Sequence, residues 1–189
     1  MGSTRAQANQ AVKDGLNKDW VTREQPQHTV ELTDYFIGKY PVTNSEYQLF
    51  IQEVGQPSPR GWSGSQFPEQ KGAHPVINVS WEDAQAYCDW LGKKTGKNYH
   101  LLTEAEWEKA ARGADLRIYP WGDAFDPGKA NTAESSIGGT TPVGQYSPQG
   151  DSPYGCADMA GNVRCASRFR YHPVIFASDL GFRVVLSPI

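Results

Sequence analysis

The segment Leu101–Gly122, LLTEAEWEKAARGADLRIYPWG, constrains the fold more than any other part of the chain. Thr103 precedes Glu106 by the three-residue spacing of a capping box, in which a hydroxyl and a carboxylate satisfy free amide groups at the start of a helix. Gly113 then provides a helix end. Between them an apolar stripe recurs at helical spacing: Trp107, Ala110 and Ala111. The segment therefore predicts a capped helix with Trp107 buried, followed by an aromatic turn at Tyr119–Gly122.

Two further helices are predicted by the same signals. The first runs from Thr43 to about Val54 and ends at Gly55, with Thr43 and Glu46 as its capping box. Its inward stripe is Tyr47, Phe50, Ile51 and Val54. The second helix begins at Ser80, with Asp83 at the third position, and is expected to stop at Gly92. Its inward stripe is Ala84, Tyr87, Cys88 and Leu91, which makes Cys88 a core residue.

Strands and loops are predicted on both sides of these helices. Residues Thr4–Gln27 are polar and indicate a long surface loop. Residues Gln27–Leu32 alternate between polar and apolar, which is typical of a strand, and Tyr35–Tyr40 indicates a more buried strand. From Asp123 to Asn162, turn-forming residues occur every few positions, so little regular structure is expected there.

Length and composition limit the classes of protein that fit. A chain of 189 residues favours one domain. The net charge of -3 gives no reason to expect nucleic acid as a partner, and no apolar run is long enough for a membrane span. Nineteen Gly, thirteen Pro and 12% aromatic residues indicate irregular backbone held by rings. Three unpatterned cysteines argue against a disulfide scaffold and favour a reducing compartment. No signal peptide is visible, and the localisation is left open between the cytoplasm and the cell surface.

Several runs carry a resemblance to a known family. These are L-x-T-E-A-E-W-E-x-A-A-R-G at Leu101–Gly113, Y-x-I-G-K-Y-P-V-T-N at Tyr35–Asn44 and H-P-V-x-x-V-S-W at His74–Trp81. They closely resemble the formylglycine-generating-enzyme (sulfatase-modifying factor) family. The resemblance implies an α+β, C-type-lectin-like fold with short helices, twisted antiparallel strands and much ordered coil. It also implies a single domain over residues 1–189 that lacks an upstream strand, since Met1-Gly2-Ser3 matches only the end of the family's opening strand.

The junction between Val163 and Arg164 bears on whether the chain is an enzyme. In the family, D-M-A-G-N-V continues into W-E-W and later R-G-G-S-W, whereas here it runs directly into R-C-A-S-R at Arg164–Arg168. The resemblance therefore implies that a segment is absent between the two residues, and with it the family's catalytic cysteine pair. Cys165 does not match either member of that pair. A non-enzymatic role is favoured, because no Ser, His and carboxylate grouping offers another catalytic centre.

Calcium is the one cofactor that the sequence suggests. Side-chain and backbone oxygens cluster in the irregular region, and such oxygen-only clusters suit Ca²⁺ better than zinc. The candidate ligands are Asn131, Glu134 and Ser135 with the carbonyls of Thr132 and Ile137, and a second group at Asp158 and Asn162. The resemblance supports both groups, since the family often places Ca²⁺ at A-N-T-x-E-S and D-x-x-G-N-V.

The C-terminal run suggests a binding surface. A fixed frame, R-C-A-x-R-x-R-x-x-P-x-x-x-x-x-x-x-G-F-R-V-V, resembles the variable region of diversity-generating-retroelement variable proteins, in which randomised adenines yield a mixed residue set. The eleven variable positions are Ser167, Phe169, Tyr171, His172, Val174, Ile175, Phe176, Ala177, Ser178, Asp179 and Leu180. None is Lys, Glu, Gln, Met or Trp. The alternative is that the apolar members of this set are ordinary core residues.

The function predicted from these features is ligand binding without catalysis. The C-terminal face would bind a protein or another macromolecule, with four side chains as anchors: Phe169, Tyr171, His172 and Phe176. Ser167, Ser178 and Asp179 would add polar contacts. The competing prediction is a formylglycine-generating or related oxidative enzyme whose catalytic cysteines lie in the segment absent between Val163 and Arg164.

Overall fold

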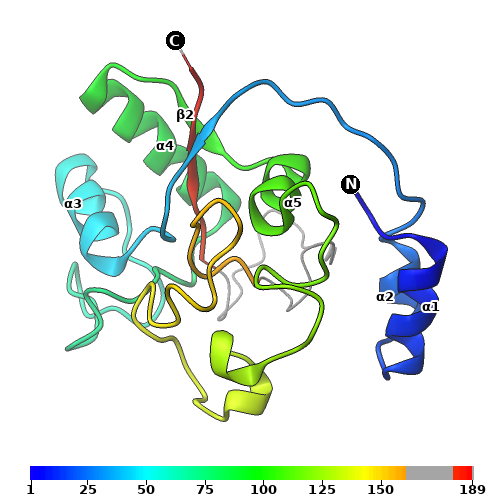
Figure 1. Ribbon diagram of the computed structural model, residues 1–189. Helices are drawn as coiled ribbons and strands as arrows, with labels where there is room; N and C mark the ends of the chain where they lie inside the picture. Colours follow the sequence, from blue (N-terminus) through cyan, green and yellow to red (C-terminus); the bar gives the residue numbers. More distant parts are fainter. Residues whose placement is uncertain (161–180, 189) are drawn as a thin grey trace.

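The computed structural model describes residues 1–160 and 181–188, and residues 161–180 and 189 lie outside this description. Helices and strands alternate irregularly along the chain, joined by long stretches of coil (Figure 1). In chain order the elements are α1 (Arg5–Lys13), α2 (Lys18–Thr22), β1 (Phe36–Ile37), α3 (Asn44–Val54), α4 (Trp81–Thr95), β2 (Tyr99–Leu101), α5 (Glu104–Arg112), the 3₁₀ turns η1 (Pro127–Lys129) and η2 (Ala133–Ser135), and β3 (Val184–Leu186).

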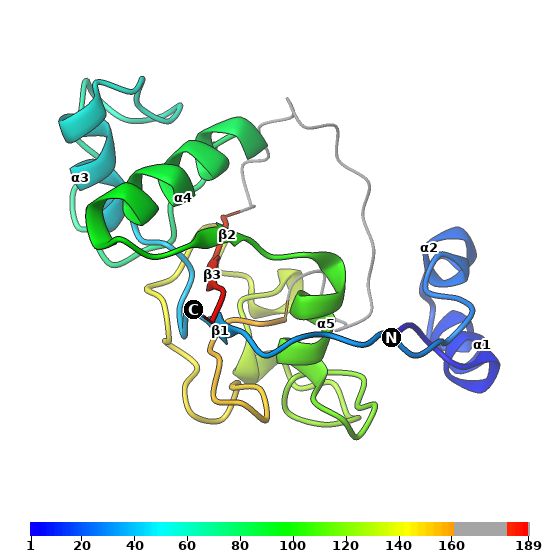
Figure 2. The ribbon, with the colours of Figure 1, turned by 90° about the horizontal axis from the view of Figure 1, so that it is seen from above.

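A small antiparallel sheet joins distant parts of the sequence. Its strand order is β1-β3-β2, so the C-terminal strand β3 lies between the other two. Val185 pairs with Ile37 on one side and with His100 on the other, and its side chain is fully buried. Helix α4 packs along β2 (Figure 2). The predicted fold class, α+β with short helices, antiparallel strands and much ordered coil, is confirmed.

The two predicted capping boxes are present at the starts of α3 and α5, and the predicted cap Ser80 forms a third box with Asp83 at the start of α4. In α5 the Thr103 amide donates to Glu106 Oε2 at 2.7 Å, and the Thr103 hydroxyl accepts from the Glu106 amide at 3.3 Å. The predicted stop of α4 at Gly92 is wrong, because the helix continues to Thr95 and ends at Gly96 with a φ of 70°. Glycine inside a helix costs only about 1 kcal/mol relative to alanine, so it does not by itself end one.

The main core forms where α3 packs against α4. The Tyr47 ring stacks on Tyr87 with 5.9 Å between centroids and meets Phe50 edge-on at 5.2 Å. Ring contacts of this kind add to the stabilisation that burial gives. Cys88 is fully buried beside this core, as predicted. Val54 is exposed, contrary to prediction, because it is the last residue of α3, beyond the buried part of the stripe.

A second core cluster lies under α5. Ala110 and Ala111 are buried against Cys156 and Met159, so the predicted helical phase is confirmed. Trp107 packs against the same cluster but is only half-buried, which corrects the prediction of full burial. The reason is that its side chain also lines a cavity.

The N-terminal region differs from its prediction. The expected loop Thr4–Gln27 contains α1 and α2, which lie side by side at one end of the molecule, beyond α5 (Figures 1 and 2). Thr4 and Gln7 form a further capping box at the start of α1. The two helices share a small buried cluster: Ala8, Ala11 and Val21. Because alanine supplies most of it, the apolar stripe is too weak to stand out in the sequence.

The strand predictions before α3 were mostly wrong. Residues Gln27–Leu32 form no strand. Among the described residues, the main-chain hydrogen bonds of this segment are the two between His28 and Met1, with N–O distances of 2.8 and 2.9 Å. Only Phe36–Ile37 of the predicted strand Tyr35–Tyr40 is a strand, and Phe36 is 66% exposed. Alternation of polar and apolar residues does not supply the partner that a ladder needs.

The irregular region was predicted correctly as far as it is described. Within Asp123–Ala160 the regular structure consists of η1 and η2. Before it, Tyr119 and Gly122 exchange two main-chain hydrogen bonds of 2.8 and 3.1 Å, and Tyr119 stacks on Trp121 at 5.6 Å with ring planes 7° apart. The aromatic turn is therefore confirmed.

Candidate functional site

A cavity of about 320 Å³, here called the central cavity, lies where the described chain stops and resumes. Ala160 and Gly181, the described residues on either side of 161–180, both line it. Its wall combines apolar and polar groups, among them Trp107, Asn131, Thr140, Asp158, Phe182 and Arg183. A concave site with a few convergent polar groups is the usual form of a ligand-binding pocket.

Arg183 fixes one wall of the central cavity. Its Nη1 donates to the Gly38 carbonyl and its Nη2 to the Ala157 carbonyl, each at 2.6 Å. Burial lowers the pKa of the guanidinium to about 10, against the opposing effect of Cys156 and Asp158. The side chain therefore stays charged at neutral pH, and it joins the coil before α3 to the loop before Asp158.

Asp158 lies half-buried on the same wall. Its Oδ2 accepts a hydrogen bond from the Gly144 amide at 2.7 Å, and its backbone is left-handed, with a φ of 54°. Burial raises the pKa of the carboxyl, while the Gly144 amide and Arg183 lower it. Asp158 was predicted as a metal ligand, which stays a prediction, and in this structure its Oδ2 binds the loop at Gly144.

Phe182 and Gly181 connect the cavity to the main core. The Phe182 ring meets Tyr87 at 5.4 Å and Tyr47 at 6.1 Å, edge-on in both cases. A Cβ atom at Gly181 would lie 2.9 Å from the Val76 carbonyl oxygen, so glycine is needed for this close approach. The G-F-R part of the predicted frame is therefore held firmly by the scaffold.

The eleven predicted binding residues lie outside the described residues, so the structure does not place them. This applies to Ser167, Phe169, Tyr171, His172, Val174, Ile175, Phe176, Ala177, Ser178, Asp179 and Leu180. The Val163–Arg164 junction, Cys165 and the candidate ligand Asn162 lie outside as well. The structure describes the scaffold on either side of residues 161–180, where Ala160 and Gly181 line the central cavity.

The predicted calcium loop does gather oxygen atoms. The Ser135 hydroxyl lies 2.6 Å from the Thr132 carbonyl and 3.3 Å from Asn131 Oδ1, while Asn131 Nδ2 donates to Gly139. Three neutral oxygens of this kind suit a hard cation. Glu134 is exposed beside them, and hydrogen bonds from its own backbone amide and from Thr132 lower its carboxyl pKa. The oxygen donors at Asn131–Ser135 are of the type that calcium takes, and Ile137 lies exposed at the end of the same loop.

The cysteines of the described chain are placed for packing. Cys88 and Cys156 are both buried and unpaired, and neither lines the central cavity. Burial raises the pKa of the Cys88 thiol to about 12, so the thiolate needed for nucleophilic or copper chemistry is strongly disfavoured. In residues 1–160 and 181–188, no three His, Cys, Asp or Glu side chains gather in one place.

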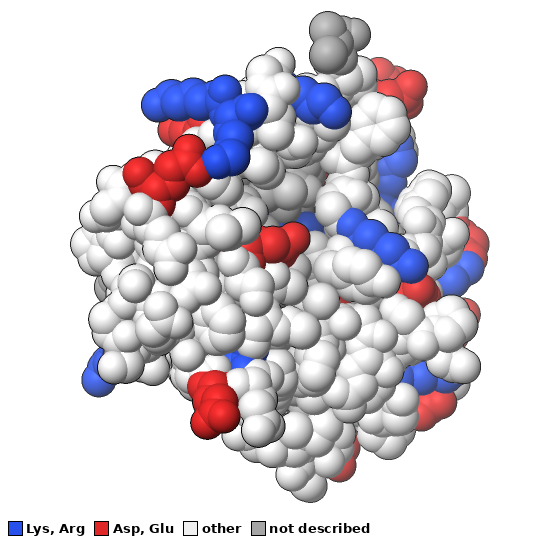
Figure 3. Space-filling view, turned by 90° about the vertical axis from the view of Figure 1, so that its left-hand side faces the viewer, with Lys and Arg blue, Asp and Glu red and all other residues white. Residues whose placement is uncertain are grey.

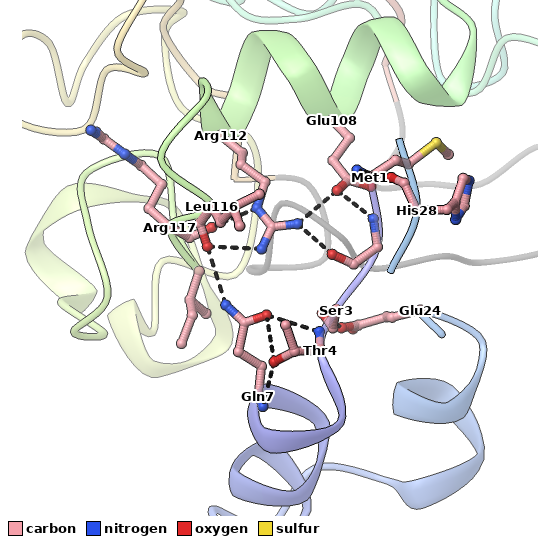
Figure 4. Close-up of polar contacts among 12 residues, drawn as sticks. Met1, Ser3, Thr4, Gln7, Glu24, His28, Glu108, Arg112, Leu116 and Arg117 are labelled. Atoms are coloured by element: carbon pink, nitrogen blue, oxygen red, sulfur yellow. Dashed lines mark hydrogen bonds and ion pairs between the residues drawn. The ribbon is translucent and has the colours of Figure 1, made fainter. Parts of the chain in front are cut away.

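Sequence reasoning missed a buried ionic cluster, here called the N-terminal clamp, which consists of Gly2, Glu108 and Arg112 (Figure 4). Glu108 and Arg112 are each 3% exposed and form an ion pair of 2.7 Å. Gly2 donates its amide to Glu108 Oε1 at 2.7 Å, and its carbonyl accepts from Arg112 Nη1 at 2.6 Å. In the sequence, a Glu and an Arg four residues apart on a helix indicate an ordinary exposed pair.

A second cavity, of about 480 Å³, borders this clamp and is lined by His28, Val30, Leu32, Lys109 and Tyr154 among others.

The surface charge of the protein is mixed. On the face shown in Figure 3, positive and negative side chains are interspersed and most of the surface is uncharged. None of the described helices is long and apolar enough to cross a membrane.

Comparison with known proteins agrees with this architecture. The sequence model of the family described as "Sulfatase-modifying factor enzyme 1-like domain" matches residues 2–165. The formylglycine-generating enzyme of Thermomonospora curvata is 32% identical over 194 residues, which cover 74% of this chain and 61% of that protein. The inactive C-alpha-formylglycine-generating enzyme 2 of Bos taurus is 44% identical over 100 residues, covering 47% and 31% respectively. The chain thus spans less than two thirds of each relative.

Two solved structures share the fold. PvdO from Pseudomonas aeruginosa superimposes with a TM-score of 0.73 at 23% identity, over 87% of this chain and 85% of that one. Treponema denticola variable protein 1 superimposes with a TM-score of 0.72 at 22% identity, over 85% and 87%. At these identities the likeness concerns the fold alone. Because the family's sequence model covers most of its residues, the chain belongs to the sulfatase-modifying factor enzyme 1-like (formylglycine-generating enzyme) family.

Proposed function

We propose that this chain is a non-enzymatic binding protein whose C-terminal run, residues 167–180, is a diversified surface for a protein or another macromolecular ligand. The scaffold holds the run from the side of β3, and variation within the run changes the ligand rather than the fold. Loops on a rigid scaffold commonly carry recognition in this way.

The observation that carries the proposal is the anchoring of Phe182 and Arg183. Directly after the run, Phe182 enters the aromatic core and Arg183 bonds to the Gly38 and Ala157 carbonyls. Strand β3 begins at the next residue, Val184, and is paired on both sides. The chain is thus fixed by residues outside the eleven positions, which leaves those positions free to vary.

Two further findings support it. The eleven positions contain only residue types that randomised adenines would yield. The fold is shared with a protein named as a variable protein in Treponema denticola. In this proposal Phe169, Tyr171, His172 and Phe176 anchor the ligand, since aromatic side chains dominate recognition energy. Ser167, Ser178 and Asp179 supply polar contacts.

A library tests the proposal. Displayed on a cell or phage surface, the eleven positions are randomised together and the clones are sorted by resistance to protease. We expect most clones to remain folded, and selection on one purified protein target to yield specific binders. The matched control randomises buried positions of α3 and α4, where most clones should be lost. Loss of resistance in both libraries would overturn the proposal.

The competing function is a formylglycine-generating or related oxidative enzyme, and the 32% identity with the Thermomonospora curvata enzyme favours it. In that case two cysteines would lie in a segment absent between Val163 and Arg164. Sequencing the gene and its messenger RNA across this junction distinguishes the two functions. A continuous reading frame with no added cysteine pair supports the binding protein, and an intervening cysteine pair supports the enzyme.

Calcium is a separate part of the proposal. We propose a structural Ca²⁺ ion at the loop whose candidate ligands are Asn131, the Thr132 carbonyl, Glu134, Ser135 and the Ile137 carbonyl. Asp158 and Asn162 form a second, separate group of candidate ligands. When bound, the ion would hold the irregular loop beside the central cavity in one conformation. Its proposed role is structural, and no chemical step is assigned to it.

A further inference from the structure

A buried histidine outside the proposed binding face joins two parts of the scaffold. His74 is 8% exposed, and its Nδ1 lies 2.9 Å from the Thr140 hydroxyl oxygen. The Lys71 ammonium lies 3.5 Å from the same nitrogen and 3.5 Å from the Thr140 carbonyl oxygen. One imidazole nitrogen therefore faces a hydroxyl group and a positive charge at once.

The main chain around His74 is fixed on both sides. Toward α3, the Asn44 amide donates to the His74 carbonyl at 2.9 Å. Toward the central cavity, the Val143 amide donates to the Ala73 carbonyl at 2.9 Å. Residues Thr140, Thr141 and Val143 line the cavity, so the contact at His74 helps to hold one of its walls.

The contacts of Nδ1 depend on its protonation. An unprotonated Nδ1 accepts a hydrogen bond from the Thr140 hydroxyl and tolerates the Lys71 ammonium nearby. A protonated Nδ1 would direct an N–H group at that ammonium. Within the described residues no carboxylate lies within ion-pair distance of the imidazole to offset the added charge, and Lys71 is the charged group that faces it.

We propose that His74 is a pH-sensitive latch: its neutral imidazole holds residues 140–143 against the turn Lys71–His74, between α3 and α4, and protonation at Nδ1 releases this wall of the central cavity. The inference does not depend on the identity of the ligand or on the C-terminal run. It rests on the burial of His74 and on the convergence of Thr140 and Lys71 at one nitrogen.

The direction of the pH dependence follows from proton binding. Burial lowers the pKa of His74 below its ordinary value of 6.5, and Lys71 lowers it further, while the Thr140 backbone acts in the opposite direction. The open state therefore binds the proton more tightly than the latched state. The latch is fully effective above pH 6.5 and weakens as the pH falls from 6.5 toward the lower pKa of the latched state. Each pKa unit of separation changes the open population by about tenfold at acid pH.

Hydrogen exchange of single amides tests the latch. The Val143 amide reports on release, and the Val76 amide, which donates to Val42 at 2.9 Å within the main core, reports on global unfolding. After correction for the intrinsic pH dependence of exchange, we expect Val143 to lose protection between pH 7.5 and 5.5 while Val76 does not. Equal changes at both amides, or none at Val143, would overturn the proposal.

Three variants sharpen the test. His74→Asn keeps an acceptor near Thr140 but cannot titrate, so the change at Val143 should disappear. Lys71→Met removes the facing charge and should reduce that change, and it serves as the second test if His74→Asn fails to fold. His28→Asn alters an exposed histidine that does not line the central cavity and should behave as the wild type. If the single variants Lys71→Met and His74→Asn both kept the full wild-type change in Val143 protection, the latch would be contradicted.

Discussion

Replacing Arg112 with methionine tests the N-terminal clamp, because methionine keeps part of the side chain's volume and removes its charge. In the structure Arg112 donates to Gly2, Glu108, Leu116 and Arg117, with N–O distances between 2.6 and 3.0 Å. Removing it leaves the Glu108 carboxylate buried without its cation and takes one donor from each of three carbonyl groups, of which the Leu116 carbonyl still accepts from Gln7 Nε2 at 3.2 Å.

The magnitude follows from burial. The side chains of Glu108 and Arg112 are each 4% exposed, so solvent does not screen the unpaired charge. Removing one partner of a buried ion pair lowers the free energy of unfolding by about 3–5 kcal/mol. For a denaturant slope of about 2 kcal/mol/M, the urea midpoint should fall by about 1.5–2.5 M.

Urea unfolding followed by circular dichroism measures this change. Lys109→Met, at an exposed position of α5 three residues before Arg112, is the matched control and should lie within about 0.5 kcal/mol of the wild type. The double variant Glu108→Gln with Arg112→Met should lose less than the sum of the single changes, because it leaves no buried charge. A loss below about 1 kcal/mol in Arg112→Met would refute the account of the clamp.

Three further predictions concern the ion, the backbone and the thiol. If calcium binds at Ser135, chelation should lower the melting temperature, since an ion at a hundredfold excess over its Kd stabilises the fold by about 2.7 kcal/mol. Ser135→Ala should respond less to chelation. Identical melting of the wild type with chelator and with calcium would contradict the site. Gly150→Ala should cost about 1–3 kcal/mol, because its Cβ would lie 2.2 Å from the Lys129 carbonyl oxygen. The control Gly139→Ala meets nothing within 4 Å and should melt as the wild type does. Cys88, with its thiol pKa raised to about 12, should resist alkylation in the native protein and react in denaturant, as read by peptide mass spectrometry.

The helices were predictable because their signals are local. Thr43, Ser80 and Thr103 each lie within three residues of the carboxylate that completes the capping box. Helix α1 uses the same device with Gln7 in place of an acidic residue and buries little more than alanine, so its pattern is weak. Strands are different, since Phe36 pairs with Leu186 across the length of the chain. No local pattern identifies so distant a partner.

The candidate site was predictable in part for a related reason. The frame residues Phe182 and Arg183 were predicted to belong to the scaffold, and in the structure Arg183 is buried in it and the partly buried Phe182 packs against the main core. Glu108, Arg112 and His74 were missed as structural groups, because such side chains are usually exposed and their burial depends on distant partners. Asp158 was assigned from its surroundings in sequence, whereas its hydrogen-bond partner Gly144 comes from another loop.

The proposal of a diversified face is tested most directly by replacing four of its apolar residues together. In this variant Phe169, Tyr171, Ile175 and Phe176 become serine, and thermal unfolding is compared with that of the wild type and of Phe182→Ser. A binding face predicts a cooperative transition close to that of the wild type, since surface changes usually cost within about 0.5 kcal/mol each. Phe182→Ser should be clearly destabilised, because its ring packs in the main core. Loss of the cooperative transition in the fourfold variant would show that these residues are core and would contradict the proposed function.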